Sequence, residues 1–201
     1  MSTQIKAKLL QHFSGKKKAN GGFTLIELLV VIIIIGILSA IALPSFLNQA
    51  SKAKQSEAKT YIGSVNRAQQ AYYMENGTMA INDQFAQLGL GINKTTKNYK
   101  YRLIDATPAA NGVRTFTAAV AKPIDQALKV YAGGVKTATI GEGVNQEATT
   151  LATLCEALLP AVVGGTDGTT GAETDITTWL KDVNATATTQ PSCNLTKMKS
   201  L

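Results

Sequence analysis

The residues that could carry chemistry in this chain are few, and they argue against a catalytic site. His12 is the only histidine among 201 residues, and it lies in a basic N-terminal stretch. A chain that loses this stretch cannot form the Ser/His or Cys/His pair of nucleophilic catalysis. The short pair Gly89-Leu90-Gly91 lacks the helix signature and the Lys-Ser/Thr of a phosphate-binding loop. We therefore expect no enzymatic activity, no bound metal and no cofactor.

One carboxylate stands at a costly position. Glu27 precedes 24 residues, Leu28 to Ser51, that carry no charge, and twelve residues between Leu28 and Leu43 are Leu, Ile or Val. Together these twelve side chains contribute about −4 to −7 kcal/mol to insertion into a bilayer, which outweighs one acid at the end of the segment. About 20 apolar residues suffice for a helix to cross the hydrocarbon core. The segment is therefore predicted to span a membrane, and Glu27 needs either a cationic partner or access to the interface.

Two cysteines, Cys155 and Cys193, are the other candidate reactive groups. Neither lies in a Cys-x-x-Cys or metal-ligand spacing. In an exported protein they are predicted to form one disulfide, and the alternative is two separate buried thiols.

The positive charge of the chain is concentrated before the apolar segment. The net charge is +7, but five lysines and no acid precede residue 22, and the rest of the chain holds 15 basic and 13 acidic side chains. Such a distribution keeps the N-terminal end in the cytoplasm and sends the residues after 51 across the membrane. It does not specify direct binding to nucleic acid.

A helix is predicted from about Phe23 to Glu75. Beyond the apolar segment its period continues, and Asn76-Gly77 supplies the stop. Asn66 and Gln70 are expected on faces other than the apolar one. The apolar residues recur at steps of three and four, which is typical of an amphipathic helix: Ala58, Tyr61, Ile62, Val65, Ala68, Tyr72 and Tyr73.

Short strands are predicted after Gly77. In residues 99–103 tyrosine and leucine alternate with Lys100 and Arg102, which indicates a strand with one apolar and one charged face. Further strands are expected at 115–121, at 128–131 and, after Gly133-Gly134, at 135–140. Residues 164–192 are expected to form a long surface loop with one helical turn around 176–183.

The expected fold is α+β, with the long N-terminal helix packed on a small antiparallel sheet. Its parts are a leader (1–22), a transmembrane and polymerisation segment (23–51) and an exported head (52–201) that includes the amphipathic half of the helix.

A basic leader ending in Gly22, followed by Phe23-Thr24-Leu25-Ile26-Glu27 and an aliphatic helix, resembles the type III signal of type IV pilins. Residues 52–59 and 66–72 resemble the helix of cyanobacterial major pilins in particular.

This resemblance implies roles for individual residues. Prepilin peptidase would cut between Gly22 and Phe23 and methylate the new amine of Phe23, and Glu27 would neutralise an amine of a neighbouring subunit. Charge attraction in a medium of low dielectric constant supports such a pairing. Gly36 and Pro44 match positions between which the family's helix loses regular hydrogen bonding in the filament, although both residues are also tolerated in transmembrane helices without a function.

The resemblance predicts a structural subunit of a type IV pilus that serves adhesion, motility or DNA uptake. Its partners would be membrane lipid before assembly, prepilin peptidase, the inner-membrane assembly machinery and other copies of itself. The protein would move from the inner membrane to an extracellular pilus. A minor pilin or a type II secretion pseudopilin is the alternative, and the cysteine pair favours a pilin. A third possibility is a secreted soluble protein cleaved after Ala42, because Ala40-Ile41-Ala42 has the small-x-small form of a signal-peptidase site.

Overall fold

One long helix, α2 (Leu25–Asn76), opens the part of the chain that can be described. The computed structural model describes residues 22–105, 113–140, 147–165, 180–181, 190–194 and 198–201. The chain forms two units, one ending at Leu47 and the other running from Asn48 to Leu201. The helix begins and ends within two residues of the predicted bounds, so this prediction is confirmed. At its end Gly77 adopts a left-handed conformation (φ 68°), and its N–H donates to the carbonyl oxygen of Tyr73 at 2.8 Å.

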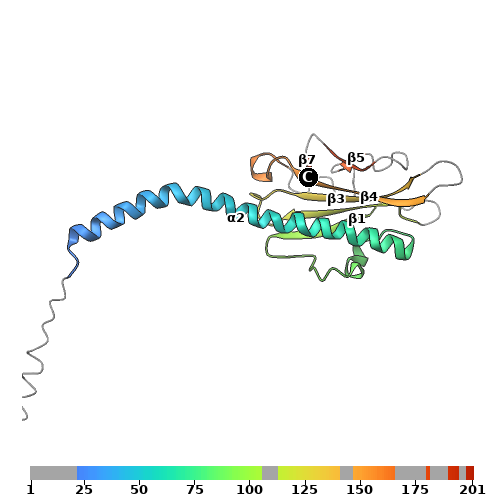
Figure 1. The fold of residues 1–201 in the computed structure, drawn as a ribbon, viewed down its shortest axis with the longest axis horizontal. Helices are drawn as coiled ribbons and strands as arrows, with labels where there is room; N and C mark the ends of the chain where they lie inside the picture. The colour runs from blue at the N-terminus through green and yellow to red at the C-terminus, as the bar shows by residue number, and fades with distance from the viewer. Residues whose placement is uncertain (1–21, 106–112, 141–146, 166–179, 182–189, 195–197) are drawn as a thin grey trace, which may run out of the picture. The chain divides into compact units, whose positions relative to one another are not determined.

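An antiparallel sheet forms the body of the second unit, here called the head. Its strand order is β1-β2-β3-β4-β7. The strands are β1 (Tyr99–Asp105), β2 (Phe116–Pro123), β3 (Tyr131–Ile140), β4 (Glu147–Ala157) and β7 (Met198–Ser200). Two short strands, β5 (Leu180–Lys181) and β6 (Ser192–Cys193), pair with each other. Two 3-10 turns, η1 (Asn82–Leu88) and η2 (Ala161–Val163), complete the described elements. The α+β fold with a helix packed on an antiparallel sheet is confirmed (Figure 1).

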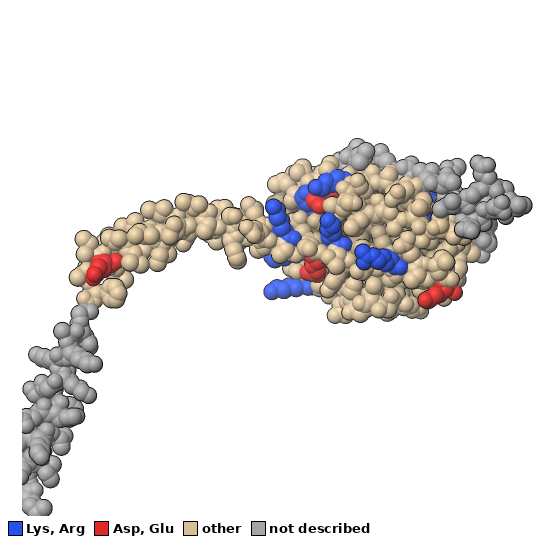
Figure 2. Space-filling view, viewed as in Figure 1, with Lys and Arg blue, Asp and Glu red and all other residues tan. Residues whose placement is uncertain are grey.

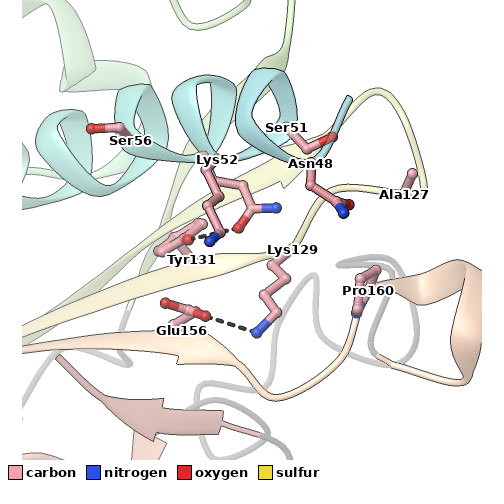
Figure 3. A pocket seen from close by; sticks show the side chains of 10 residues that line it. Asn48, Ser51, Lys52, Ser56, Ala127, Lys129, Tyr131, Glu156 and Pro160 are labelled. Carbon is pink, nitrogen blue, oxygen red and sulfur yellow. Dashed lines mark hydrogen bonds and ion pairs between the residues drawn. The ribbon is translucent and has the colours of Figure 1, made fainter. Parts of the chain in front are cut away.

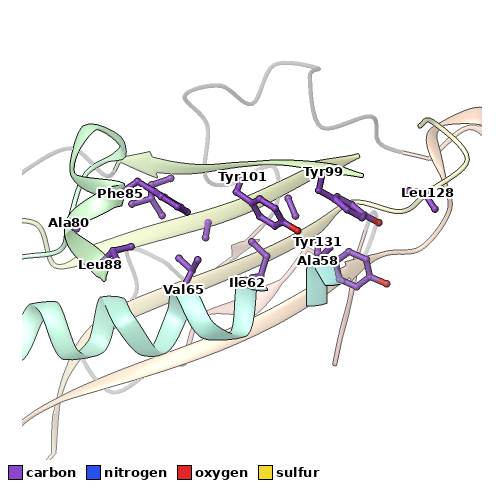
Figure 4. Close-up of a cluster of buried hydrophobic side chains, with 13 residues drawn as sticks. Ala58, Ile62, Val65, Ala80, Phe85, Leu88, Tyr99, Tyr101, Leu128 and Tyr131 are labelled. Carbon is purple, nitrogen blue, oxygen red and sulfur yellow. The ribbon is translucent and has the colours of Figure 1, made fainter. Parts of the chain in front are cut away.

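The face of the sheet that meets α2 carries an aromatic core (Figure 4). Tyr99, Tyr101 and Leu103 of β1 are buried, whereas Lys100 is exposed, which confirms the predicted alternation. The rings of Tyr61 and Tyr101 lie 5.3 Å apart, a distance at which aromatic pairs attract each other. The other buried members of this core are Ala58, Ile62, Val65, Ala80, Phe85, Leu88, Ala119, Ala121, Leu128 and Tyr131.

The opposite face of the sheet is also buried. Leu180, Cys193 and Met198 are at most 2% exposed and pack with Phe116 and Val120. The prediction of a surface loop at 164–192 is therefore wrong at Leu180–Lys181 and Ser192, which belong to strands, whereas Gly164 and Gln190 are exposed and outside any strand. The physical reason lies in the sheet, because strand β2 is apolar on both faces and needs a cover on each. The predicted helical turn is wrong at Leu180–Lys181, which form β5, and the rest of 176–183 lies outside the described residues.

Gly133 and Gly134 lie inside β3 and not between two strands, so that prediction is wrong. A Cβ on Gly133 would lie 2.5 Å from Oδ1 of Asn66, and one on Gly134 would lie 2.5 Å from Cδ1 of Leu180. The two glycines therefore allow α2 and the C-terminal segment to approach the two faces of the same strand. Of the predicted strand 128–131, only Tyr131 belongs to a strand.

Polar side chains of α2 contact the sheet and the segment after the helix. Asn66 is 6% exposed, contrary to its predicted place away from the apolar face, and its Nδ2 donates to the carbonyl oxygen of Thr153 at 2.8 Å. Gln69 exchanges two hydrogen bonds with the backbone of Ala80. Because each buried amide finds a partner, these residues fix the position of α2 on the sheet.

Candidate processing, assembly and anchoring sites

The first turn of α2 is closed by a capping box. The backbone N–H of Glu27 donates to Oγ1 of Thr24 at 3.2 Å, and both the backbone N–H and the hydroxyl of Thr24 donate to Oε2 of Glu27 at 2.8 Å. The carboxylate is therefore held at the start of the helix, where unpaired N–H groups favour negative charge. Sequence reasoning did not assign a role to Thr24, although the spacing Thr-x-x-Glu was visible.

Gly22 and Phe23 precede the helix. Both residues are exposed and non-helical, and the side chain of Phe23 is 86% exposed. The peptide bond between them is thus in accessible backbone that a peptidase can bind. Residues 1–21 of the predicted leader lie outside the described residues.

The apolar part of α2 runs from Leu28 to Leu47 in the first unit. It is the only helix in the described part of the chain that is long and apolar enough to cross a membrane. Gly36 lies inside it with no heavy atom within 4 Å of its potential Cβ, and Pro44 lies inside it without ending the helix. Proline has no N–H, so the carbonyl group of Ala40 loses its helical partner. Loss of regular hydrogen bonding within a filament stays a prediction.

Cys155 and Cys193 form a disulfide, which confirms the prediction over two separate thiols. Their Cα atoms lie 5.7 Å apart, and the bond joins β4 to β6. Both residues are nearly or fully buried in the core on the far side of the sheet from α2. The disulfide therefore attaches the C-terminal segment to a central part of the sheet.

Glu57 of α2 connects the helix to the segment that precedes β1. Its carboxylate accepts hydrogen bonds from the hydroxyl of Thr96, from Nδ2 of Asn98 and from the hydroxyl of Tyr101. Partial burial raises the pKa of Glu57, but the three hydrogen bonds outweigh it and leave this pKa below its ordinary value. The arrangement is structural, and no periodic pattern in the residues predicted it.

A polar groove with a volume of about 670 Å³ lies between α2 and the ends of β3 and β4 (Figure 3). Lys129 forms an ion pair with Glu156 at 2.8 Å, and the hydroxyl of Tyr131 donates to Oε1 of Gln55 at 3.3 Å. Lys52 also lines the groove. Among the described residues, no group of three or more His, Cys, Asp or Glu is placed to hold a metal ion.

The predicted site residues do not come together in one place. Gly22, Phe23, Glu27, Gly36 and Pro44 belong to the first unit. The disulfide and the groove belong to the head. The described residues thus form an exposed segment before α2, an apolar half of α2 and a head that is cross-linked by a disulfide.

Known protein families match both the start of α2 and the head. Residues 17–43 match the prokaryotic N-terminal methylation motif, and residues 55–178, more than half of the chain, match the family described as type IV pilin-like G and H. The type IV major pilin protein PilA of Myxococcus xanthus is 52% identical over 56 residues, which are 28% of this chain and 26% of that protein. The fimbrial protein EcpC of Eikenella corrodens is 36% identical over 101 residues, 50% of this chain and 64% of EcpC.

The type IV wide pilus major component PilA4 of Thermus thermophilus is 35% identical over 86 residues, which are 43% of this chain and 65% of PilA4. In each of these three comparisons the chain spans less than two thirds of the relative's length. No solved structure matches the chain. The matched family model covers most of the head, and the methylation motif covers the start of the helix, so the chain belongs to the type IV pilin-like family.

Proposed function

We propose that this protein is a structural subunit of a type IV pilus, inserted in the inner membrane through α2 and then polymerised into an extracellular filament. One observation carries the proposal. Every large apolar side chain described from Phe23 to Leu47 is at least 44% exposed. An exposed apolar surface of this length needs a cover, which lipid provides before assembly and other copies of the chain provide afterwards.

The N-terminal end supplies the chemistry for processing and pairing. Prepilin peptidase would cut the accessible bond between Gly22 and Phe23 and methylate the new amine. The amine of a neighbouring copy would then approach Glu27. Oε2 of Glu27 accepts the two hydrogen bonds from Thr24, and a carboxylate has about four acceptor positions, so the cap and an amine can be held together.

The organisation that we propose has a leader (1–22), a transmembrane and polymerisation segment (23–51) and an exported head (52–201). Gly36 and Pro44 would mark the part of the segment that loses regular hydrogen bonds in the filament. The inner-membrane assembly machinery would extract the processed chain.

Several relatives are named as major pilins, which favours a major subunit over a minor pilin or a pseudopilin. Adhesion, motility or DNA uptake would be the use of the filament. The likeness of residues 52–72 to cyanobacterial major pilins stays a prediction, because the relatives described here come from Myxococcus, Eikenella and Thermus.

Mass spectrometry of the mature chain tests this proposal. We expect a chain that begins at a methylated Phe23 and is abundant in sheared surface fibres. Gly22→Ala should leave the uncut precursor in the membrane, whereas the matched change Gly21→Ala, one residue from the bond, should be processed. A mature chain that starts at Leu43 would overturn the proposal and favour the secreted soluble protein.

A further inference from the structure

A second apolar surface lies on two loops of the head, and neither the core nor the proposed polymerisation accounts for it. The backbone N–H of Val162 donates to the carbonyl oxygen of Gln126 at 3.2 Å, which joins the loop after β2 to the loop after β4. The second loop contains the turn η2, which ends at Gly164 (φ 86°). We call the exposed residues of these loops the apolar loop patch: Ile124 (51% exposed), Leu158 (41%), Leu159 (51%), Val162 (63%) and Val163 (59%).

The patch lies at the end of the head where the apolar run of α2 stops. Ala127 and Pro160, from the same two loops, line the groove together with Asn48 and Ser51 of α2 (Figure 3). Leu47 is the last large apolar residue of the run. Lys52 follows five positions later, which is about 7 Å of helix. A headgroup layer is about 5 to 7 Å thick on each side of the hydrocarbon core. Residues 48–52 are thus at headgroup depth if the run spans the bilayer.

Basic side chains lie at the same end of the head. Lys52 lines the groove, and Lys54 is exposed on α2. Glu156 is engaged by Lys129 at 2.8 Å and by Lys199 at 3.6 Å. In the neighbouring loop, the carboxylate of Asp125 accepts from the N–H of Ala127 at 2.9 Å. Figure 2 shows basic side chains gathered at this end of the head.

Exposed aliphatic side chains beside lysines are the composition of surfaces that bind the membrane interface. We propose that, before assembly, the apolar loop patch inserts into the headgroup layer, with anionic lipid phosphates at Lys52 and Lys54. The head then has two attachments to the bilayer, the spanning helix and this patch. The inference rests on the proposed function, because it needs the apolar part of α2 to span the membrane. A lipid surface is the favoured occupant because the two loops line one groove with Asn48 and Ser51, the first residues of the head after the apolar run, and because Lys52 in the same groove has the charge that complements anionic lipid.

The test uses the full chain in vesicles that contain two brominated lipids, one with bromine near the top of the acyl chain and one with bromine near its end, because Leu38 lies near the middle of the apolar run and the patch would lie near the headgroups. A fluorescent amino acid is placed at Val163, at Leu38 in the apolar run, or at Glu75. Glu75 is exposed and lies 27 residues from Asn48, about 40 Å along the helix. We expect strong quenching at Leu38 and Val163 and little at Glu75. The change Leu159→Ser with Val162→Ser should lower quenching at Val163 several-fold.

Charge and folding have their own controls. Lys52→Gln with Lys54→Gln should lower quenching at Val163 in phosphatidylglycerol vesicles and leave it unchanged in phosphatidylcholine vesicles. All of the substituted residues are exposed, and Lys52 also lines the groove. The melting temperature of the head should therefore stay within a few degrees of the wild-type value.

The outcomes separate the two proposals. An unquenched Leu38 would overturn the membrane span and this inference with it. A quenched Leu38 with Val163 no more quenched than Glu75 overturns the inference alone. If, in that case, cells with Leu159→Ser and Val162→Ser make fewer surface fibres than the wild type, the patch contacts a neighbouring copy and not lipid.

Discussion

Replacing Gly133 by alanine tests how closely α2 is packed on the sheet. A Cβ at this position would lie 2.5 Å from Oδ1 of Asn66 and 2.6 Å from Cγ2 of Ile62. Both side chains belong to the buried face of α2. Interiors packed at crystal density do not tolerate such contacts, so the helix or its side chains must move.

The free-energy terms have opposite signs. Overpacking costs about 1 to 3 kcal/mol. Moving Asn66 would break its hydrogen bond to Thr153, which costs about 1 to 3 kcal/mol when a buried polar group loses its partner. Alanine in a strand otherwise gains about 0.5 to 1 kcal/mol over glycine. We expect Gly133→Ala to lower the free energy of unfolding by about 1 to 5 kcal/mol, and the melting temperature by about 2 to 20 °C.

Near-ultraviolet circular dichroism of the full chain in detergent measures this change. All six tyrosines lie between residues 61 and 131, so the signal follows the head and not the apolar segment. Gly63→Ala is the matched control, because nothing lies within 4 Å of its potential Cβ. In the interior of α2 it should gain about 0.5 to 1 kcal/mol. A Gly133→Ala protein as stable as the wild type would refute the close packing of α2 on β3.

Three further predictions concern the disulfide and two carboxylates. Cys193→Ser should lose about 4 kcal/mol of stability, because the unfolded chain is no longer cross-linked, and should leave residues 164–201 protease-sensitive; an unchanged urea midpoint would contradict this. Glu57→Gln should destabilise the head at neutral pH, because a neutral amide replaces a carboxylate that accepts three hydrogen bonds. The contribution of Glu57 is complete above the ordinary carboxyl pKa of 4.5 and is lost as the pH falls through the lower folded value, so the difference between the two melting temperatures should shrink between pH 6 and pH 3. Glu27→Gln should permit insertion and cleavage but reduce surface fibres, and normal piliation would show that Glu27 serves only as a cap.

The helix and the first strands could be predicted because their patterns are local. Apolar residues recur at steps of three and four in the second half of α2, and apolar and charged residues alternate in β1 from Tyr99 to Leu103. Strand β4 was missed, because apolar and polar residues do not alternate regularly in Glu147–Ala157, and its place in the sheet depends on pairing with β3 and β7. Strands β5 and β6 have two residues each, which is too short for any pattern.

Contacts between distant residues could not be predicted from one sequence. Gly133-Gly134 has the composition of a turn, and only the approach of α2 and Leu180 from the two sides explains why it is a strand. The groove likewise joins Lys52, Lys129 and Glu156, which are far apart in the chain. The site residues Gly22 and Glu27 could be predicted, because they lie at the boundary between the basic stretch and the apolar run, which is visible in the sequence.

If the head is exported as proposed above, the position of β7 in the sheet would set an order of events during export. Strand β4 pairs with β3 on one edge and with Met198–Ser200 on the other. Cys155 of the same strand forms its disulfide with Cys193. If the head crosses in chain order, β4 emerges after β3 but about 40 residues before Cys193 and Met198–Ser200. During that interval the outer edge of β4 is an unpaired template that can pair with a strand of another molecule. On the proposed function, the spanning helix would hold each chain at the membrane surface while its sheet is incomplete. Crowding of newly exported chains there, and not their stability once folded, would then limit how fast the subunit can accumulate.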